Sequence, residues 1–288
     1  MIFRMRYALA LVLLLASLDT LARADFGQVI ADLEQKNGGR LGVSAFNIAN
    51  GERLGYRVNE RFAMASTFKL LLVAAVLHQV DLGTETLDRS VKFSAADIQS
   101  YAPITSKHLK DGQMSVSELC AATLQYSDNT AANLLLKRVG GPAGLTRYIR
   151  TLGDKTTRLD RNEPSLNANI TGDLRDTTTP IAMLNSMQTL LVGNVLSINS
   201  KKQLTKWLIG NTTGDAKLRA GFNPAWKVGD KTGSGANGAS NDVAIVWPDK
   251  YLPFLITVYY TDSTISSEQQ SKVIADVGRV VARMFYQD

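Results

Sequence analysis

The chain has 288 residues, 45% of them apolar and 20% charged, which is the balance of a folded protein with one large or two small domains. The formal net charge of +6 is scattered, without a run of basic residues, and this argues against a nucleic-acid-binding protein. The single cysteine, Cys120, excludes an internal disulfide. The two histidines lack ligand spacing, so we expect no metal site and no cofactor.

The first 24 residues have the pattern of a secretory signal peptide. Arg4 and Arg6 form a basic start, residues 7–15 are a short apolar core, and Ala22-Arg23-Ala24 fits a cleavage site. The apolar core is too short to span a membrane. Removing this segment removes three arginines and one aspartate, so the net charge falls to +4. We expect a mature chain from Asp25 that is periplasmic or secreted, with no membrane association.

The mature chain is expected to begin with a helix and a β-hairpin. Apolar residues at helical spacing predict a helix over residues 25–37, which Gly38-Gly39 ends. Residues 41–47 and 53–56 have the pattern of two strands, joined by a turn at Asn50-Gly51.

The middle of the chain is predicted to be mostly helical. A run that is apolar on every face, residues 70–77, predicts a helix buried all round, which opens at Ser66 and ends before Gly83. Cys120 lies in a later helical pattern and is expected to be buried. Further helices are expected over residues 117–126, 131–139, 142–152, 179–191 and 200–209. Residues 154–179 are polar and lack periodicity, which favours a functional loop.

The last third returns to strands and closes with a helix. Residues 225–231, 242–247 and 254–260 are predicted strands, and residues 267–285 a terminal helix. The simplest assembly is an α+β fold: an antiparallel five-stranded sheet, flanked by the N- and C-terminal helices, with an inserted all-helical domain. The expected domains are a discontinuous α/β domain, residues 25–60 plus 210–288, and an all-α domain, residues 61–209, that includes the 154–179 loop.

The sequence Ser66-Thr67-Phe68-Lys69 carries the first chemical signal. Residues three apart on a helix are neighbours, so the Lys69 amine is expected within reach of the Ser66 hydroxyl. An adjacent amine and a positive helix end can activate a serine as a nucleophile. The alternative is a helix-capping serine beside a surface lysine, but a lysine that enters an apolar helix needs a reason to be there.

Three other polar groups are ordinary when taken singly. Ser127-Asp128-Asn129 lies in the break between two predicted helices, where a turn or a cap is usual. Lys231-Thr232-Gly233 ends a predicted strand, and Glu163-Pro164 with Asn167 lies in the polar loop.

All these motifs together resemble the class A serine β-lactamases. The known signature of that family and of penicillin-binding proteins is Ser-x-x-Lys, Ser-Asp-Asn and Lys-Thr-Gly, which occur here in order at Ser66, Ser127 and Lys231. The resemblance covers essentially the whole mature chain, including residues 161–164 and 173–176. The pattern through Asn241-Asp242 most resembles the cefotaxime-hydrolysing branch.

The resemblance implies a catalytic role for four side chains. Ser66 would attack the lactam carbonyl and form an acyl-enzyme. Lys69 and Glu163 would share the task of deprotonating Ser66, and which of them leads is left open. Ser127 would pass a proton to the departing nitrogen. The backbone N–H groups of Ser66 and Ser234 would form the oxyanion hole.

The resemblance also implies a set of substrate-binding residues. Asn129 would bind the side-chain amide of the substrate, and Thr232 and Ser234, beside Gly233 of the same motif, would hold its carboxylate. Lys231 would orient Ser127 and raise the positive potential. Tyr101 would form an aromatic wall, and Asn167 would position the hydrolytic water together with Glu163. Arg161 and Asp176 would pair at the base of the loop, where a cis Glu163-Pro164 bond is expected.

Two departures from the family pattern bear on the substrate. Many members carry an arginine nine residues after the motif lysine, where this chain has Ser240. Lys217 or Arg219 could supply the missing cation, and we favour Lys217. Serine carbapenemases of this class carry cysteines at the positions of Ala65 and Gly235. Ser234 and the adjacent Gly235 resemble enzymes that accept bulky oxyimino cephalosporins. We therefore expect turnover of penicillins and cefotaxime-like drugs and weak turnover of carbapenems.

The resemblance leaves two other functions open. A penicillin-binding D,D-peptidase shares the first three motifs but normally lacks the pair formed by Glu163 and Asn167. A non-hydrolysing β-lactam sensor domain would normally carry a membrane anchor. We expect a monomeric, secreted enzyme whose partner is a small β-lactam substrate.

Overall fold

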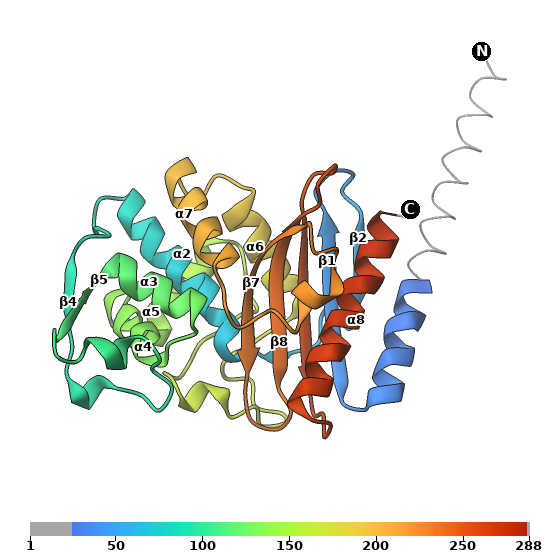
Figure 1. Ribbon diagram of the computed structural model, residues 1–288, viewed down its shortest axis with the longest axis horizontal. Coiled ribbons are helices and arrows are strands. Elements are labelled where there is room, and N and C mark those ends of the chain that lie inside the picture. Colours follow the sequence, from blue (N-terminus) through green and yellow to red (C-terminus); the bar gives the residue numbers. More distant parts are fainter. Residues whose placement is uncertain (1–24, 287–288) are drawn as a thin grey trace, which may run out of the picture.

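Five antiparallel strands from both ends of the chain form one sheet (Figure 1). The computed structural model describes residues 25–286, so the expected signal peptide lies outside the described residues. Across the sheet the order is β2 (Arg53–Tyr56), β1 (Arg40–Asn47), β9 (Phe254–Thr261), β8 (Ser240–Trp247) and β7 (Lys227–Ser234). The predicted α+β fold with a five-stranded antiparallel sheet is confirmed.

Both faces of the sheet are buried, because its strands alternate apolar residues between two cores. Along β8, Val243 and Ile245 belong to one core, whereas Ala244 and Val246 belong to the other. One face is covered by α8 (Ser267–Phe285) and by a helix over residues 25–37. The helical part of the chain covers the opposite face.

The helical part is built around α2 (Phe68–Asp81). Its first ten residues are all buried, since helices pack against it from several sides. The other helices of this part are α3 (Val116–Gln125), α4 (Asn129–Arg138), α5 (Gly141–Thr151), α6 (Pro180–Leu191) and α7 (Ile198–Ile209). Cys120 on α3 is fully buried, as predicted.

Short elements complete the region between residues 61 and 209. Two small antiparallel ladders pair β3 (Phe62–Ala63) with β6 (Thr177–Thr178) and β4 (Ser90–Lys92) with β5 (Gln113–Ser115). The 3₁₀ turns are η1 (Ala65–Thr67), η2 (Ala95–Asp97), η3 (Thr105–His108) and η4 (Ser165–Asn167), and η5 (Leu218–Gly221) follows outside this region. None of the helices within residues 25–286 combines the length and the apolar character that a membrane span requires.

Two predicted boundaries near the motifs are wrong. Ser66 does not begin the long helix but lies in η1, two residues before α2 starts. The strand expected to end near Lys231 continues to Ser234, because β7 pairs with β8 through Gly233 opposite Asn241. Gly233 is a poor strand former, and pairing with a buried neighbour overrides that preference here.

The 154–179 loop is fastened at its base. The Arg161 guanidinium pairs with Asp176 at 2.5 Å, and the backbone N–H groups of Asp160 and Arg161 donate to the same carboxylate at 2.7 and 2.9 Å. The Glu163–Pro164 peptide bond is cis, as expected. These contacts hold Glu163 toward η1 and α2.

Candidate active site

A buried carboxylate joins the two residues of the first motif. Ser66 Oγ donates to Glu163 Oε1 at 3.2 Å, and Lys69 Nζ lies 2.9 Å from the same oxygen. The side chains of Lys69 and Glu163 are fully buried. The expected contact between the Lys69 amine and the Ser66 hydroxyl is thus replaced by a shared contact with Glu163, since a buried ammonium is best stabilised by a carboxylate.

The turn between α3 and α4 brings the second motif to the same place. Lys69 Nζ donates to the Ser127 carbonyl at 2.7 Å and to Asn129 Oδ1 at 2.6 Å. Lys231 Nζ donates to Ser127 Oγ at 3.1 Å, so the Ser127 hydroxyl lies between two amines. Ser127 has a φ of 57°, a conformation that costs free energy in a residue other than glycine and that is common at functional sites.

Asp128 anchors this turn to the loop that carries Tyr101. Its carboxylate caps α4 through the Ala131 N–H at 2.9 Å and accepts from the hydroxyl of Thr105 at 3.0 Å. The Asn129 N–H donates to the Tyr101 carbonyl at 3.0 Å. Tyr101 is 50% exposed, so its ring is open to solvent.

The loop supplies the remaining polar groups around Glu163. Asn167 Nδ2 donates to Glu163 Oε2 at 2.6 Å, so both carboxylate oxygens have partners. Asn133 on α4 holds the main chain: its Oδ1 accepts from the Glu163 N–H at 3.0 Å and its Nδ2 donates to the Glu163 carbonyl at 2.9 Å.

The third motif lies on β7, the edge strand of the sheet, against η1. A Cβ placed on Gly233 would lie 2.8 Å from the Met64 carbonyl oxygen and 3.2 Å from the Ser66 nitrogen, so only glycine fits there without a shift. Thr232 Oγ1 lies 2.5 Å from Thr213 Oγ1, and Ser234 is exposed at the end of the strand. The strand therefore presents its polar end beside Ser66.

Comparisons with known proteins agree over almost the whole chain. Residues 25–285 match the family described as the beta-lactamase enzyme family. The chain is 46% identical to β-lactamase OXY-2 of Klebsiella oxytoca, covering 95% of this chain and 94% of that one. It is 47% identical to CTX-M-25 of Escherichia coli, covering 93% and 92%. The chain belongs to the class A β-lactamases.

Solved structures of class A β-lactamases have the same fold as this β-lactamase. An ancestral class A β-lactamase is 51% identical, with a TM-score of 0.88 over 90% of this chain and 99% of that one. The putative class A β-lactamase PenP from Rhodopseudomonas palustris is 50% identical, with a TM-score of 0.88 over 90% and 98%.

The two cations considered in place of the missing arginine have different surroundings in this β-lactamase. Arg219 pairs with the buried carboxylate of Asp230 at 2.6 Å and donates to the Ile209 carbonyl at 3.0 Å. Lys217 lies behind the third motif and donates to the carbonyls of Gly233 and Asn241 at 3.3 and 3.2 Å. Arg219 is committed to the fold, which leaves Lys217 as the cation next to the motif strand.

Burial shifts the titration of the charged groups in the β-lactamase site. It lowers the pKa of Lys69, an effect that the Glu163 carboxylate opposes. Burial and the charge of Lys69 lower the pKa of Lys231 to about 7. Burial raises the pKa of Asp242 well above its usual value, and the neighbouring Asp230 adds to that rise. Neutral and charged forms of the Lys231 amine are therefore both accessible near neutral pH.

Sequence reasoning missed the positioning roles of two residues, although Asn241 belongs to the pattern that resembles the cefotaxime-hydrolysing branch. Asn133 holds Glu163, and its only signal is that it lies four residues after Asn129, one turn along α4. Asn241 Nδ2 donates to the carbonyls of Ala63 and Met64 at 2.9 and 3.0 Å and so fastens the segment before Ser66. Among residues 25–286, no group of three or more histidine, cysteine, aspartate or glutamate side chains could hold a metal ion.

Proposed function

We propose that this β-lactamase hydrolyses the lactam amide of penicillins and cephalosporins through an acyl-enzyme on Ser66, and so confers β-lactam resistance. The observation that carries the proposal is the Glu163 carboxylate, which contacts the Ser66 hydroxyl through one oxygen and Asn167 through the other. The Glu163 carboxylate is therefore within reach of the Ser66 hydroxyl and of a water molecule next to Asn167.

Acylation uses the Ser66 hydroxyl as the nucleophile. Its oxygen bonds to the lactam carbonyl carbon, and its proton moves to Glu163 or to Lys69. The direct contact favours Glu163, whereas the lowered pKa of the Lys69 amine favours Lys69, so both stay candidates. The backbone N–H groups of Ser66 and Ser234 stabilise the oxyanion, a role supported by the close approach of Gly233 to the Ser66 nitrogen.

Opening of the ring breaks the lactam C–N bond, and Ser127 gives a proton to the departing nitrogen. The contacts of the Ser127 hydroxyl with Lys69 and Lys231 support this role, because either amine can replace the proton that Ser127 loses.

The substrate is held by groups on both sides of the nucleophile. Asn129 binds the side-chain amide. The substrate carboxylate lies against the polar end of β7, and the residues that bind it there are Thr232, Ser234, Lys231 and Lys217, with Gly233 giving the strand room to approach. Tyr101 forms a wall at the opening.

Deacylation separates this function from the two alternatives. Glu163, helped by Asn167, removes a proton from a water molecule that attacks the acyl carbon, and Glu163 then passes this proton to the Ser66 oxygen as the ester bond breaks. A D,D-peptidase or a sensor domain normally lacks this pair. Both side chains are present, and they contact each other at 2.6 Å.

The proposal includes a substrate spectrum, a cellular location and a division into domains. Penicillins and cefotaxime-like cephalosporins are turned over and carbapenems only weakly, because Ala65 and Gly235 stand where carbapenemases carry cysteines. The enzyme is a periplasmic or secreted monomer. Its α/β domain comprises residues 25–60 and 210–288, and its helical domain comprises residues 61–209.

Steady-state hydrolysis of a chromogenic cephalosporin, benzylpenicillin, cefotaxime and imipenem tests the proposal. We expect multiple turnovers of the first three, and intact-protein mass spectrometry should find no adduct on Ser66→Ala. An unmodified enzyme that stays acylated indefinitely would overturn the hydrolase in favour of a sensor or a peptidase. Imipenem hydrolysis as fast as benzylpenicillin hydrolysis would contradict the spectrum.

A further inference from the structure

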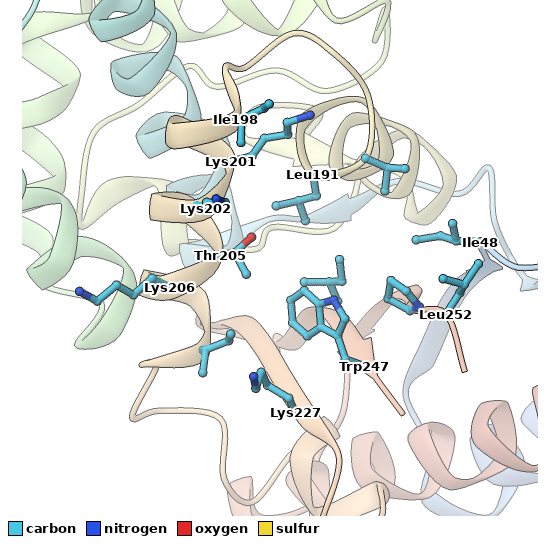
Figure 2. Close-up of a pocket in the computed structure, with 14 residues that line it drawn as sticks. Ile48, Leu191, Ile198, Lys201, Lys202, Thr205, Lys206, Lys227, Trp247 and Leu252 are labelled. Carbon is cyan, nitrogen blue, oxygen red and sulfur yellow. The ribbon is translucent and has the colours of Figure 1, made fainter. Parts of the chain in front are cut away.

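A groove of about 780 Å³ separates α7 from the end of the sheet (Figure 2). Its volume lies in the range of about 300–1,000 Å³ that is typical of small-molecule sites. Most of its lining is apolar, and the half-buried Trp247 indole forms its floor. The main apolar side chains are Ile48, Leu191, Ile198, Ile209, Trp247 and Leu252.

The groove is separate from the catalytic site. Lys227, which lines it, begins β7, whereas the third motif occupies the other end of that strand. At about 3.3 Å per residue, the backbone of Lys227 lies about 13 Å from that of Lys231. A molecule in the groove would therefore leave Ser66 accessible.

The charged side chains at the groove all have the same sign. Four lysines line it, Lys201, Lys202, Lys206 and Lys227, and its lining contains no aspartate or glutamate. An adjoining hollow that shares Trp247 contains one exposed carboxylate, Asp249. A ligand of this groove meets donors rather than acceptors, and a carboxylate is an acceptor-only group that suits them.

The four lysines are not equally available. Lys201 Nζ donates to the Gly193 carbonyl at 2.8 Å, and Lys206 points away from the groove in Figure 2. Lys202 and Lys227 are exposed, and within residues 25–286 neither has a hydrogen-bond or ion-pair partner. Their apolar stems can cover a bound chain while their ammonium groups stay in water.

We propose that this groove binds a free long-chain carboxylic acid. The acyl chain lies on the apolar floor beside Trp247, and the carboxylate lies at the rim formed by Lys202 and Lys227. Ile198 and Leu252, which also line the groove, are exposed, so a bilayer surface is the alternative occupant that the experiment has to separate from a free acid. The inference is independent of the proposed hydrolysis, because it concerns binding at a second place.

Fluorescence titration of the full mature chain with sodium laurate, below its critical micelle concentration, tests the proposal. We expect a saturable change in tryptophan emission, which Trp247→Phe abolishes while calorimetry with the same variant still detects binding. Dodecyltrimethylammonium, which has the same chain and the opposite charge, should bind much more weakly.

Charge-reversal variants test the lysine rim. Lys202→Glu combined with Lys227→Glu should raise the laurate Kd about tenfold, since two attractive charges at the rim become two repulsive charges. Lys110→Glu, an exposed lysine in the helical part away from the groove, is the matched control and should bind laurate normally. The Trp247→Phe variant, the double charge-reversal variant and the Lys110→Glu control should all hydrolyse the chromogenic cephalosporin at the parent rate, if the parent hydrolyses it.

Three results would overturn the proposal. These are equal affinity for laurate and for dodecyltrimethylammonium, a laurate Kd that the double charge reversal does not change, and binding to phosphatidylglycerol vesicles without binding to laurate. The last result would identify the groove as a membrane-facing surface.

Discussion

The Asn133 side chain forms hydrogen bonds with the main chain of Glu163 on both sides of its α-carbon. The amide oxygen of Asn133 accepts from the Glu163 N–H at 3.0 Å, and its amide nitrogen donates to the Glu163 carbonyl at 2.9 Å. The two residues lie 30 positions apart, one on a helix and the other in the long loop. The position of the Glu163 carboxylate is therefore set by α4 as well as by the ion pair between Arg161 and Asp176 at the base of the loop.

Replacing Asn133 should slow deacylation and destabilise the loop. Asn133→Ala leaves the N–H and C=O of the buried Glu163 without these partners, and each unsatisfied buried group costs about 1–3 kcal/mol. We expect a lower melting temperature and a burst of cephalosporin hydrolysis followed by a slower steady state. Asn194→Ala, which removes an exposed asparagine, is the control and should behave like the parent. An Asn133→Ala protein with the parental burst and the parental melting temperature would contradict this positioning role of Asn133.

The pH dependence of catalysis should reflect the Lys231 amine. Burial lowers its pKa to about 7, so the amine is cationic below that pH and increasingly neutral above it. A cation is needed next to the substrate carboxylate, and kcat/KM for benzylpenicillin should therefore fall as the pH rises from 7 to 9. The measurement is initial rates in constant ionic strength, because kcat/KM reports the pKa values of the free enzyme.

Lys231→Arg separates this amine from other titrating groups. A guanidinium stays charged throughout that range, so the alkaline fall should flatten in the variant, whatever its absolute rate. The idea fails if the parent profile is flat between pH 7 and 9, or if the variant keeps the same alkaline fall.

Short motifs in the sequence predicted most of the candidate site. Ser66, Ser127 and Lys231 could be found because their neighbours in sequence are also their neighbours in the site. The positioning role of Asn241 could not be found, because its partners, the carbonyls of Ala63 and Met64, lie almost 180 residues away in the chain. A side chain that binds a distant backbone carbonyl leaves no local periodicity or spacing to recognise.

The same reasoning explains the two boundaries that were wrong. The end of β7 depends on its pairing with β8, and the turn that holds Ser66 depends on contacts with Asn241 and Gly233. Local propensity cannot predict either, because both are fixed by segments that only folding brings together.

Lys217 should contribute to substrate binding more than to the chemical step. Lys217→Met keeps most of the buried volume and removes the charge behind the third motif. Hydrogen bonds to charged groups contribute about 1.5–3 kcal/mol, so KM for benzylpenicillin should rise about 10- to 100-fold, with a smaller change in kcat. Steady-state kinetics and a thermal melt check this, with Lys250→Met, at an exposed position, as the control. A folded Lys217→Met protein with the parental KM would remove Lys217 from the binding site.

Removing the Glu163 carboxylate should stop the reaction at the acyl-enzyme. In Glu163→Ala the hydrolytic water loses its base, and loss of a positioned general base typically costs about 10²–10⁴-fold. Acylation should suffer less, because the Lys69 amine and the Ser66 hydroxyl approach the same oxygen of Glu163, so Lys69 is close enough to accept the Ser66 proton. Without its carboxylate partner Lys69 keeps only neutral acceptors, and burial then favours the neutral amine that a base must be. Intact-protein mass spectrometry after mixing with benzylpenicillin should find the variant heavier by one substrate mass for minutes or longer.

Glu163→Gln is the matched variant, because it keeps the volume and the contact with Asn167 but lacks the basic oxygen. It should accumulate the same adduct. Turnover of the Gln variant at the parental rate would show that the Glu163 carboxylate acts through its shape alone. If Glu163→Ala hydrolyses penicillin at the parental rate, Glu163 is not the deacylation base.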